Sequence, residues 1–435
     1  MKKLALIRKE KKSQWKSCQS ITHSLSLSYE SLKGPHLEVD CYDFPQGAQA
    51  FEALLLAERL IHDSVTHIIF IDHEPHPCQL IKALKQSYSK GESSTAELIF
   101  HLFGDFVLQS QAWRECEEAL KSFSTTFICA SHKQKELVDK LLSEDCRSLV
   151  IPFALEESSI EFDQNQRGLA RKRLDLGEAY TFVYTGRLSY QKNVLDLIHA
   201  FVKLKETITG PVKLLLAGPM DDLGAPYLGK EGIAGTFFYH WEEVLRGHPS
   251  LIQGQDLQYL GNLDSAHLRD LYLASDAYIS LSAHNDEDYG ISPAEALAYG
   301  LPAILSSWGG FISFKSYFEN QVQLCPLQLG SRRHKCSHAQ VFKSMLFLLS
   351  QAKGSDERLK RSREVLDLIG HINIGSRILN EVLEREGAAF AGFSETFVKL
   401  ASVFETSPSA PFRGADAGFS QFYLSLYEDY AKALK

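Results

Sequence analysis

The sequence lacks long apolar segments. No stretch approaches the eighteen uninterrupted apolar residues that a membrane-spanning helix requires. The first apolar run, Leu4–Ile7, has only four residues before charge resumes, which is too short for the core of a signal peptide. We therefore expect a chain that is neither exported nor inserted in a membrane, with a cytoplasmic location.

Three other patterns are missing. The eight cysteines include no C-x-x-C pair and no His-rich partner spacing, so neither a zinc cage nor a disulfide framework is indicated. The net charge of −8 does not favour a nucleic-acid partner, which would require an excess of Lys and Arg. No G-x-G-x-x-G follows a predicted strand, which disfavours a dinucleotide-dependent dehydrogenase.

The 435 residues instead show short apolar runs that alternate with segments of helical period. This alternation is typical of parallel strands covered by helices on both faces, and it predicts an α/β fold with two doubly wound, Rossmann-like units. We expect a first domain over residues 1–155, a second over 170–340 and a helical segment over 341–435, whose last helix packs back towards the first domain. The predicted strands are Leu4–Ile7, Leu37–Tyr42, His67–Ile71, Leu98–Leu102, Thr126–Ala130, Leu149–Pro152, Thr181–Thr185, Lys213–Ala217, Leu257–Leu260, Ala277–Leu281 and Ala303–Ser306. The insertion from Pro219 to Gln255 is too long for a simple connection, so we expect it to carry a helix of its own or to lie near the cleft between the domains.

Residues 284–310 form the most informative segment. Ser292 is a suitable N-cap, Pro293 suits the first helical position, Glu295 has the spacing of a capping box, and Gly300 is placed to end the helix. The N–H groups around a helix start bind anions well, particularly where a glycine allows close approach. The segment therefore predicts an anion site around Gly290 to Ser292, a role that a diphosphate would fit.

Two carboxylates flank this helix start. Seven residues separate Glu287, on the loop, from Glu295, in the first helical turn. Carboxylates accept hydrogen bonds from paired sugar hydroxyls, so the two side chains could hold a hexose and a ribose. A plainer interpretation also stays open, in which Glu295 only closes the capping box and Glu287 is a solvated acid.

The segment resembles the E-x7-E signature of the family 4 retaining glycosyltransferases, which have the GT-B fold. Further landmarks of that family follow the same order along the second domain: Tyr184-Thr-Gly-Arg187-Leu with Lys192, Leu215-Leu-Ala-Gly218, Tyr259-Leu-Gly261-Asn-Leu, Leu271 to Asp276-Ala, and Gly309-Gly310. The resemblance covers residues 170 to 325 strongly and the first domain only weakly. It implies transfer of a hexosyl group from a nucleoside-diphosphate sugar, with retention of anomeric configuration.

The resemblance also implies roles for individual residues. Arg187 and Lys192, near Gly186 at a predicted strand end, would neutralise the donor diphosphate and stabilise the leaving nucleotide. Glu287 would hold the donor sugar, Gly290 and Ile291 would offer backbone N–H groups, and Glu295 would hold the ribose. The Asp286-Glu-Asp288 triplet could in principle bind a metal, but it falls inside the longer pattern, and we expect neither an obligatory metal nor a cofactor.

A histidine near the reacting sugar is harder to assign. His101 follows a predicted buried strand and is the candidate for contact with the transferred sugar or the acceptor. His73 and His76 are rivals, although the prolines beside them make a plain turn just as plausible. A structural role for His101 also stays open.

The first sixteen residues depart from the family, which tends to have a glycine-rich loop there. They hold seven basic residues and one acidic residue, and could attract a phosphate-bearing acceptor or an anionic membrane surface at the inner face. The basic residues proposed for such a membrane contact are Arg8, Lys9, Lys11, Lys12 and Lys16. The acceptor could be a glycan, a lipid or a small molecule, and a non-catalytic nucleotide-sugar or glycan-binding protein on the same scaffold stays as the alternative.

Overall fold

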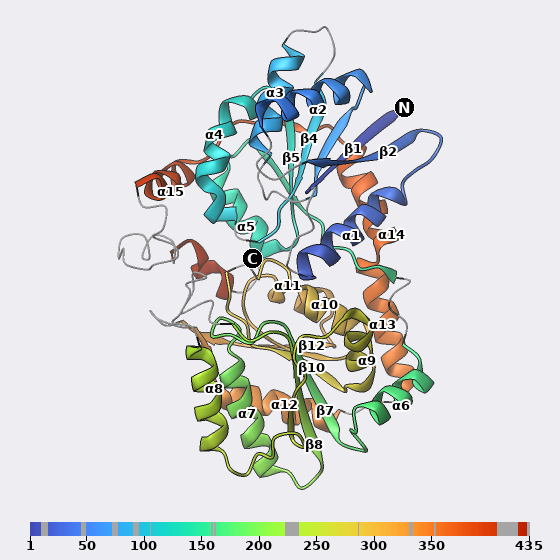
Figure 1. The fold of residues 1–435 in the computed structure, drawn as a ribbon, viewed down its shortest axis with the longest axis vertical. Coiled ribbons are helices and arrows are strands. Elements are labelled where there is room, and N and C mark those ends of the chain that lie inside the picture. The colour runs from blue at the N-terminus through green and yellow to red at the C-terminus, as the bar shows by residue number, and fades with distance from the viewer. Residues whose placement is uncertain are drawn as a thin grey trace. The chain divides into compact units, whose positions relative to one another are not determined.

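The computed structural model describes residues 1–9, 16–44, 49–71, 77–89, 95–104, 106–157, 160, 162–221, 235–285, 287–329, 334–351, 354–406 and 425–432. The chain forms two compact units. The first comprises the described residues of Met1–Glu156 and Leu368–Ser409, and the second those of Glu157–Asp367 and Ala410–Lys435. Figure 1 shows that each unit has a central sheet with helices against it.

The first unit contains a parallel sheet in the order β2-β1-β3-β4-β5-β6, to which β15 adds an antiparallel pair at the start of β5. Its strands are β1 (Lys2–Lys9), β2 (Leu37–Phe44), β3 (His67–Phe70), β4 (Glu97–His101), β5 (Ser124–Cys129), β6 (Arg147–Val150) and β15 (Ala388–Ala389). All four residues of β3 are buried. Central strands covered on both faces must be apolar throughout, which is why short apolar runs predict them.

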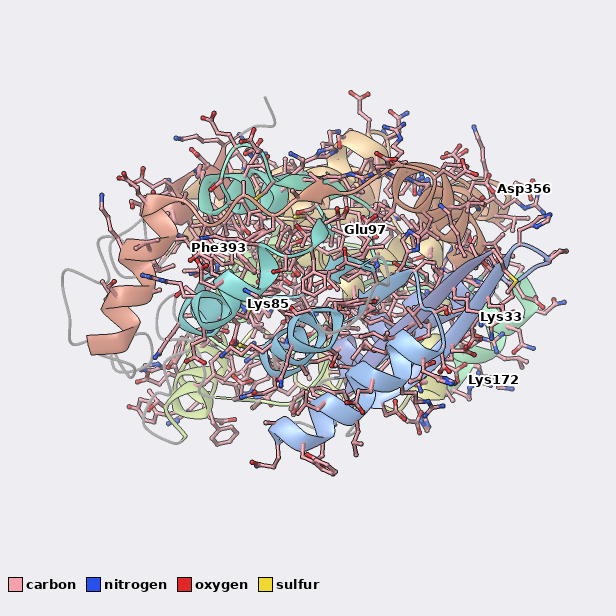
Figure 2. All side chains as sticks on the ribbon, turned by 90° about the horizontal axis from the view of Figure 1, so that it is seen from above. Lys33, Lys85, Glu97, Lys172, Asp356 and Phe393 are labelled. Atoms are coloured by element: carbon pink, nitrogen blue, oxygen red, sulfur yellow. The ribbon has the colours of Figure 1, made fainter. Side chains whose placement is uncertain are left out.

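Helices cover both faces of this sheet, with α2, α3, α4 and α15 packed in series and α1 packed on α14. They are α1 (Lys16–Glu30), α2 (Ala50–His62), α3 (Cys78–Tyr88), α4 (Ser110–Leu120), α5 (His132–Leu141), α14 (His371–Ile378) and α15 (Glu395–Thr406), with a 3₁₀ turn η1 (Phe106–Gln109) and a π turn η3 (Leu379–Leu383). Phe393, labelled in Figure 2, stacks on Phe397 with 4.3 Å between ring centroids and faces Trp113 of α4 edge-on. This aromatic packing explains why a late segment of the chain belongs to the first unit.

The second unit contains a six-stranded parallel sheet in the order β9-β8-β7-β10-β11-β12. Its strands are β7 (Tyr180–Thr185), β8 (Val212–Ala217), β9 (Leu257–Tyr259), β10 (Ala277–Ser280), β11 (Ala303–Ser306) and β12 (Val322–Cys325), beside a small hairpin of β13 (Leu327–Gln328) and β14 (Lys335–Cys336). The strand order reverses direction between β7 and β10. In open α/β sheets, ligands bind beyond the carboxyl ends of the strands at such a reversal.

Helices α7, α8 and α12 pack together on one side of this sheet, while α6 packs on α9 on the other. The helices are α6 (Gln164–Arg173), α7 (Val194–Thr207), α8 (Thr236–Gly247), α9 (Ser265–Ala274), α10 (Ile291–Ala298), α11 (Phe311–Tyr317), α12 (His338–Ser350) and α13 (Ser355–Ile369), with a final 3₁₀ turn η4 (Glu428–Ala431). Most of α7 is buried, consistent with its sequence being apolar on nearly all sides.

Eleven of the fifteen described strands coincide with the predicted ones to within a few residues, and the predicted two-unit α/β architecture is confirmed. Strands β12, β13, β14 and β15 were not predicted. The expected helix inside the long insertion is α8. The segment predicted over 341–435 is divided between the units: α15, its last α-helix, packs on α4 and α5 of the first unit, whereas the final turn η4 belongs to the second unit, where Tyr430 packs its ring on Trp308.

Candidate active site

The cations and acids identified in the sequence follow the two strands that flank the reversal of the second sheet. Strand β7 leads into Gly186 and Arg187, and β10 leads into the loop that carries Glu287. Parallel neighbours present their carboxyl ends at the same edge, so both loops leave the sheet there.

Two glycines let the neighbouring loops pass closely. Gly186 and Gly218 have φ angles of 144° and 136°, which side chains other than glycine rarely adopt. A Cβ atom on Gly218 would lie 2.0 Å from the carbonyl oxygen of Gly186. The loop that begins with Gly186 can therefore lie directly against the turn after β8.

That turn contributes an acid to the site. Arg187 Nη1 lies 3.0 Å from Asp221 Oδ2, and Arg187 Nη2 donates to Gln191 at 3.4 Å. The hydroxyl of Tyr184 donates to the carbonyl of Arg187 at 2.6 Å and so holds its backbone. Asp221 was not predicted from the sequence, although an acid just after the Gly218 turn, at a strand's carboxyl end, was a usable signal.

Lys192 and Glu287 are in direct contact. Lys192 Nζ donates to Glu287 Oε2 at 2.7 Å, and their side chains are only 14% and 12% exposed. The structure therefore brings together a predicted diphosphate ligand and a predicted sugar ligand that are far apart in the sequence.

Residues 308–310 hold the backbone of the Glu287 loop by hydrogen bonds and close packing. Gly310 N donates to the carbonyl of Glu287 at 2.8 Å, and a Cβ on Gly309 would lie 2.4 Å from the same oxygen. Gly309 N in turn donates to the carbonyl of Tyr430 at 3.0 Å. The indole N–H of Trp308 donates to the carbonyl of His284 at 2.8 Å. A segment close to the end of the chain thus supports the loop.

Helix α10 begins two residues earlier than the capping pattern predicts. Its N-cap is Gly290, with φ 102°, and no side chain caps the helix start. A Cβ on Gly290 would lie 2.5 Å from Phe311 Cε1, so glycine is required there for space as well as for conformation. The predicted Ser292 N-cap with its capping box is therefore wrong. The early start places Ile291 in the first turn, whose N–H groups have no acceptor within the helix.

Glu295 does not cap its own helix and instead accepts a hydrogen bond from a tyrosine of α9. It accepts from the hydroxyl of Tyr272 at 3.1 Å, and that hydroxyl also contacts Thr185 Oγ1 at 2.8 Å. The hydroxyl of Tyr278 donates to the carbonyl of Thr185 at 3.3 Å. Burial raises the pKa of the half-buried Glu295 to about 7, while the bond from Tyr272 opposes the rise.

Several of these charges shift the pKa values of two further buried side chains. Burial places the pKa of His284 well below its usual range, and the positive charges of Lys192 and Arg187 lower it further. Burial likewise raises the pKa of Tyr278, with contributions from both Glu287 and Glu295. The charges of both cations therefore act on His284, and those of both acids act on Tyr278.

His101 lies in the first unit, at the end of β4. Its ring is 1% exposed, and Nε2 is 2.8 Å from the hydroxyl of Tyr29. Burial lowers its pKa to about 3, so the ring is neutral at ordinary pH. The structure gives His101 an interior hydrogen bond, and its role beside the reacting sugar stays a prediction.

Several predicted residues lie outside the described part of the chain: His73, His76, Asp286, Lys11 and Lys12. Of the basic residues near the start, Arg8 pairs with Asp43 at 3.1 Å. Among the described residues, no helix combines the length and apolar character needed to cross a membrane.

The chain resembles known proteins most clearly in its second unit. Residues 166–322 match the family model of glycosyl transferases group 1, and this segment contains Arg187, Lys192, Glu287 and Glu295. An uncharacterized glycosyltransferase of Methanocaldococcus jannaschii is 25% identical over 144 residues, which span 33% of this chain and 31% of that protein. The chain therefore covers about a third of the length of this curated relative.

Solved structures extend the similarity to the whole fold. HepE of Anabaena, in complex with UDP-glucose, has a TM-score of 0.60 at 10% identity and covers 88% of this chain and 100% of its own. A glycosyltransferase from Rickettsia africae reaches 0.61 at 14% identity over 88% and 98% of the two chains. Sucrose-phosphate synthase from Thermosynechococcus elongatus reaches 0.58 at 14% identity over 88% and 99%. The protein has the GT-B fold of these structures, and residues 166–322 of its second unit are similar to the glycosyl transferases of group 1.

Proposed function

We propose that this protein is a glycosyltransferase that moves a hexosyl group from a nucleoside-diphosphate sugar to an acceptor, with retention of configuration. The contact of 2.7 Å between Lys192 and Glu287 carries the proposal, because it joins the two ligand types that such a donor requires. Arg187, in the same segment between β7 and α7 as Lys192, adds a second cation, and the match of residues 166–322 supports the same class of enzyme.

The two cations act on the leaving group. As the bond between sugar and diphosphate breaks, negative charge grows on the diphosphate oxygens, and cations held in a partly dry site stabilise it more than water does. Arg187 offers a planar pair of N–H donors and Lys192 a mobile point charge. Because side chains supply this charge, we propose that the reaction needs no metal ion.

The acids and the helix start act on the rest of the donor. Glu287 accepts hydrogen bonds from hydroxyls of the transferred sugar, and Glu295 accepts them from the ribose. The N–H groups of Gly290 and Ile291 face phosphate or sugar oxygens at the positive end of α10. A diphosphate competes with Glu287 for Lys192, which leaves the Glu287 carboxylate available to the sugar.

The donor is tested by thermal shift with UDP, GDP, ADP and their hexose conjugates. A ligand that binds only the native state raises the melting temperature, and at one hundred times its Kd the gain is about 2.7 kcal/mol. We expect one nucleotide family to stabilise the protein clearly, and Lys192→Ala to remove most of the shift. If no nucleotide moves the transition, the donor assignment is wrong.

Turnover separates an enzyme from a binding protein on the same scaffold. The stabilising donor is incubated with the protein and followed by proton NMR, which reports both its consumption and the anomeric configuration of the product. Retention and undiminished activity in EDTA are expected. Binding without any consumption, even with added glycan and lipid acceptors, would favour the non-catalytic alternative.

The predicted role of His101 needs its own variant. His101→Asn keeps a hydrogen-bonding side chain in place of the ring that contacts Tyr29. A large loss of kcat with an unchanged melting temperature supports contact with the sugar or the acceptor. A lowered melting temperature with a near-normal kcat assigns His101 to the interior of the first unit.

We also propose a peripheral contact between the basic start of the chain and anionic membranes. Cosedimentation with phosphatidylserine vesicles, falling as salt rises, is the expected result. Charge-reversal of Lys11 and Lys12 to Glu should abolish it, and equal binding to neutral vesicles would contradict it.

A further inference from the structure

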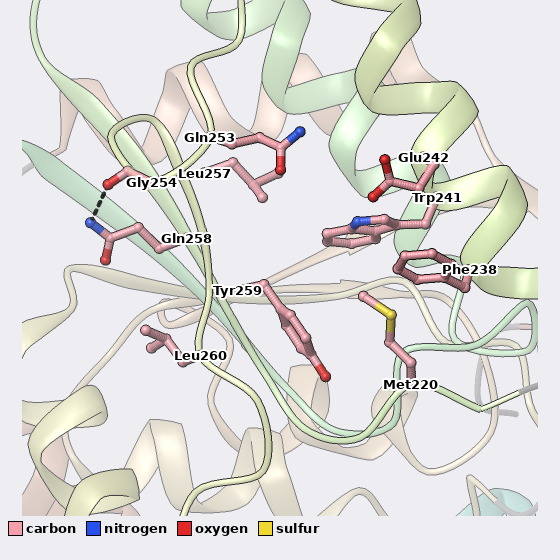
Figure 3. Close-up of a pocket in the computed structure, with 10 residues that line it drawn as sticks. All are labelled: Met220, Phe238, Trp241, Glu242, Gln253, Gly254, Leu257, Gln258, Tyr259 and Leu260. Carbon is pink, nitrogen blue, oxygen red and sulfur yellow. Dashed lines mark hydrogen bonds between the residues drawn. The ribbon is translucent and has the colours of Figure 1, made fainter.

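A hollow of about 500 Å³ opens at the edge of the second sheet, between strand β9 and helix α8. Figure 3 shows Trp241, Phe238 and Met220 close together, with the ring of Tyr259 facing them. Its lining residues are Met220, Phe238, Trp241, Glu242, Gln253, Gly254, Leu257, Gln258, Tyr259 and Leu260. The volume lies within the range of small-molecule sites, about 300–1,000 Å³.

The aromatic side chains differ in how firmly they are held. Trp241 is 4% exposed and anchors α8 to the core, whereas Phe238 and Tyr259 are 53% and 41% exposed. The hydroxyl of Tyr259 donates to the carbonyl of Gly218 at 3.0 Å, which fixes its ring beside the hollow. The exposed apolar surface of Phe238 and Tyr259 lines a hollow that is already formed. Such a surface indicates a binding site for a partly apolar ligand.

The polar lining groups restrict the chemistry of that ligand. They comprise one carboxylate, Glu242, and the amides of Gln253 and Gln258, with no lysine or arginine among the described lining residues. A neutral ligand with many hydroxyl groups finds acceptors and donors of the right kind.

The rings also favour a sugar over a flat base. Trp241 and Tyr259 are 5.9 Å apart between centroids and tilted by 59°, so the two do not form a parallel slot. A planar ring stacks best in an offset parallel arrangement, whereas the apolar face of a pyranose needs only one ring beneath it.

The hollow is joined to the loop that carries the donor-binding cations. Met220 precedes Asp221, the partner of Arg187, and pairs by a β-bridge with Leu188. The hydroxyl of Tyr190, from the same loop, donates to the carbonyl of Thr236 at the start of α8 at 3.1 Å. A ligand in the hollow therefore lies against the same loop, within one unit.

We infer that this hollow is a secondary binding site for neutral oligosaccharides, which holds two or three sugar units of a glycan chain on the second unit. The site is distinct from the residues assigned to the donor, and the inference does not depend on which nucleotide the donor carries. It gives the protein a means of retaining a glycan between encounters with donor.

The test measures binding of maltohexaose, cellohexaose and laminarihexaose to the full chain by isothermal titration calorimetry and saturation-transfer NMR. We expect at least one of them to bind, and Phe238→Ala to weaken it about tenfold, the loss that one exposed aromatic contact produces. Glu242→Gln should weaken it as well. Tyr239→Ala is the matched control, since Tyr239 lies next to Phe238 on α8, is 57% exposed and does not line the hollow.

Thermal shifts with the nucleotide panel separate this inference from the donor assignment. Phe238→Ala should leave the shift by the donor unchanged, and Lys192→Ala should leave oligosaccharide binding unchanged. The inference is overturned if none of the three hexasaccharides binds, or if Tyr239→Ala weakens binding as much as Phe238→Ala. It is also overturned if Phe238→Ala abolishes nucleotide binding, because the hollow then holds the base.

Discussion

Lys192 and Glu287 form an ion pair of 2.7 Å that joins the loop after β7 to the loop after β10. Both side chains are mostly shielded from water, so the attraction is stronger than in an exposed pair, and removal of either partner leaves a charge that is costly to bury. The pair therefore holds the two loops of the site together and links diphosphate binding to sugar binding.

Variants of the pair should separate those two roles. We expect Glu287→Gln to lower kcat/KM about 100-fold, as does loss of one preorganised contact in other enzymes, while stabilisation by the free nucleoside diphosphate persists. Lys192→Ala should lose both the activity and the stabilisation by the nucleoside diphosphate. Kinetics with the donor and thermal shifts with the diphosphate alone measure the difference. Equal loss of diphosphate binding in both variants would contradict the assignment of Glu287 to the sugar.

Glu295 should make stability depend on pH. Burial raises its pKa to about 7, so the folded state binds this proton more tightly than the unfolded chain does. Stability from this group is present at low pH and is lost as pH rises towards 7. Relative to Glu295→Gln, the wild type should therefore lose on the order of 1–3 kcal/mol between pH 4.5 and 7.5.

Chemical denaturation of both proteins across that pH range measures this difference. Taking the difference cancels the other titrating groups, since they are common to both proteins. Parallel stability profiles for the wild type and Glu295→Gln would show that the carboxyl group titrates normally.

Gly290 should tolerate no side chain. Gly290→Ala adds a Cβ that would meet Phe311 at 2.5 Å at a φ of 102°, and we expect a loss of about 2–4 kcal/mol. Gly168→Ala is the control, because Gly168 lies within α6 and a methyl group added there would meet no atom within 4 Å beyond its neighbours in the helix. Alanine should therefore stabilise by about 0.4–1 kcal/mol. Denaturant midpoints of the two variants measure these opposite changes in stability. A neutral Gly290→Ala would show that the α10 start readily rearranges.

Arg358 should be a major structural residue of the second unit. Its buried guanidinium donates to three carbonyl groups, those of Tyr299, Ser275 and Tyr272, at 2.7–2.9 Å. Burial lowers its pKa to about 9. Arg358→Met removes a donor from each of these carbonyls, although that of Ser275 keeps a bond from Arg167 Nη1 at 2.9 Å. A loss of about 3–5 kcal/mol is expected.

The control is Lys360→Met on the same helix, where an exposed side chain makes only an i,i+4 pair with Glu364. Its stability should change by less than about 0.5 kcal/mol. Comparable losses in the two variants would mean that the carbonyl network contributes little.

The last described turn should matter for donor binding. Tyr430 is 3% exposed and packs on Trp308, beside the glycines that hold the Glu287 loop. Tyr430→Ala should destabilise the protein by about 3 kcal/mol and weaken donor binding several-fold, because the loop loses its support. Lys432→Ala, an exposed change in the same segment, serves as control. Unaltered donor affinity in a folded Tyr430→Ala protein would contradict this role.

Much of the fold was predictable because it depends on local composition. Strands such as β3 and β11 are short, apolar and buried along their whole length, so they read directly as strands of a covered parallel sheet. Strand β12 was not predicted, because only Val322 and Cys325 of its four residues are buried and its sequence has no continuous apolar run. The unit to which the final residues belong depends on where the ring of Tyr430 packs, and a local sequence pattern does not show this.

The sequence by itself determined the α/β alternation, the two-unit organisation and the candidates Arg187, Lys192, Glu287 and Glu295, since these depend on residue types at fixed spacings. Only the tertiary structure decided the partners: Glu287 for Lys192, Asp221 for Arg187, and Tyr272 for Glu295 in place of a helix cap. Each of these contacts joins two separate loops or two separate helices of the second unit. Their geometry follows from the order of the strands and from the room available to the backbone, which the spacing of residues along the chain does not encode.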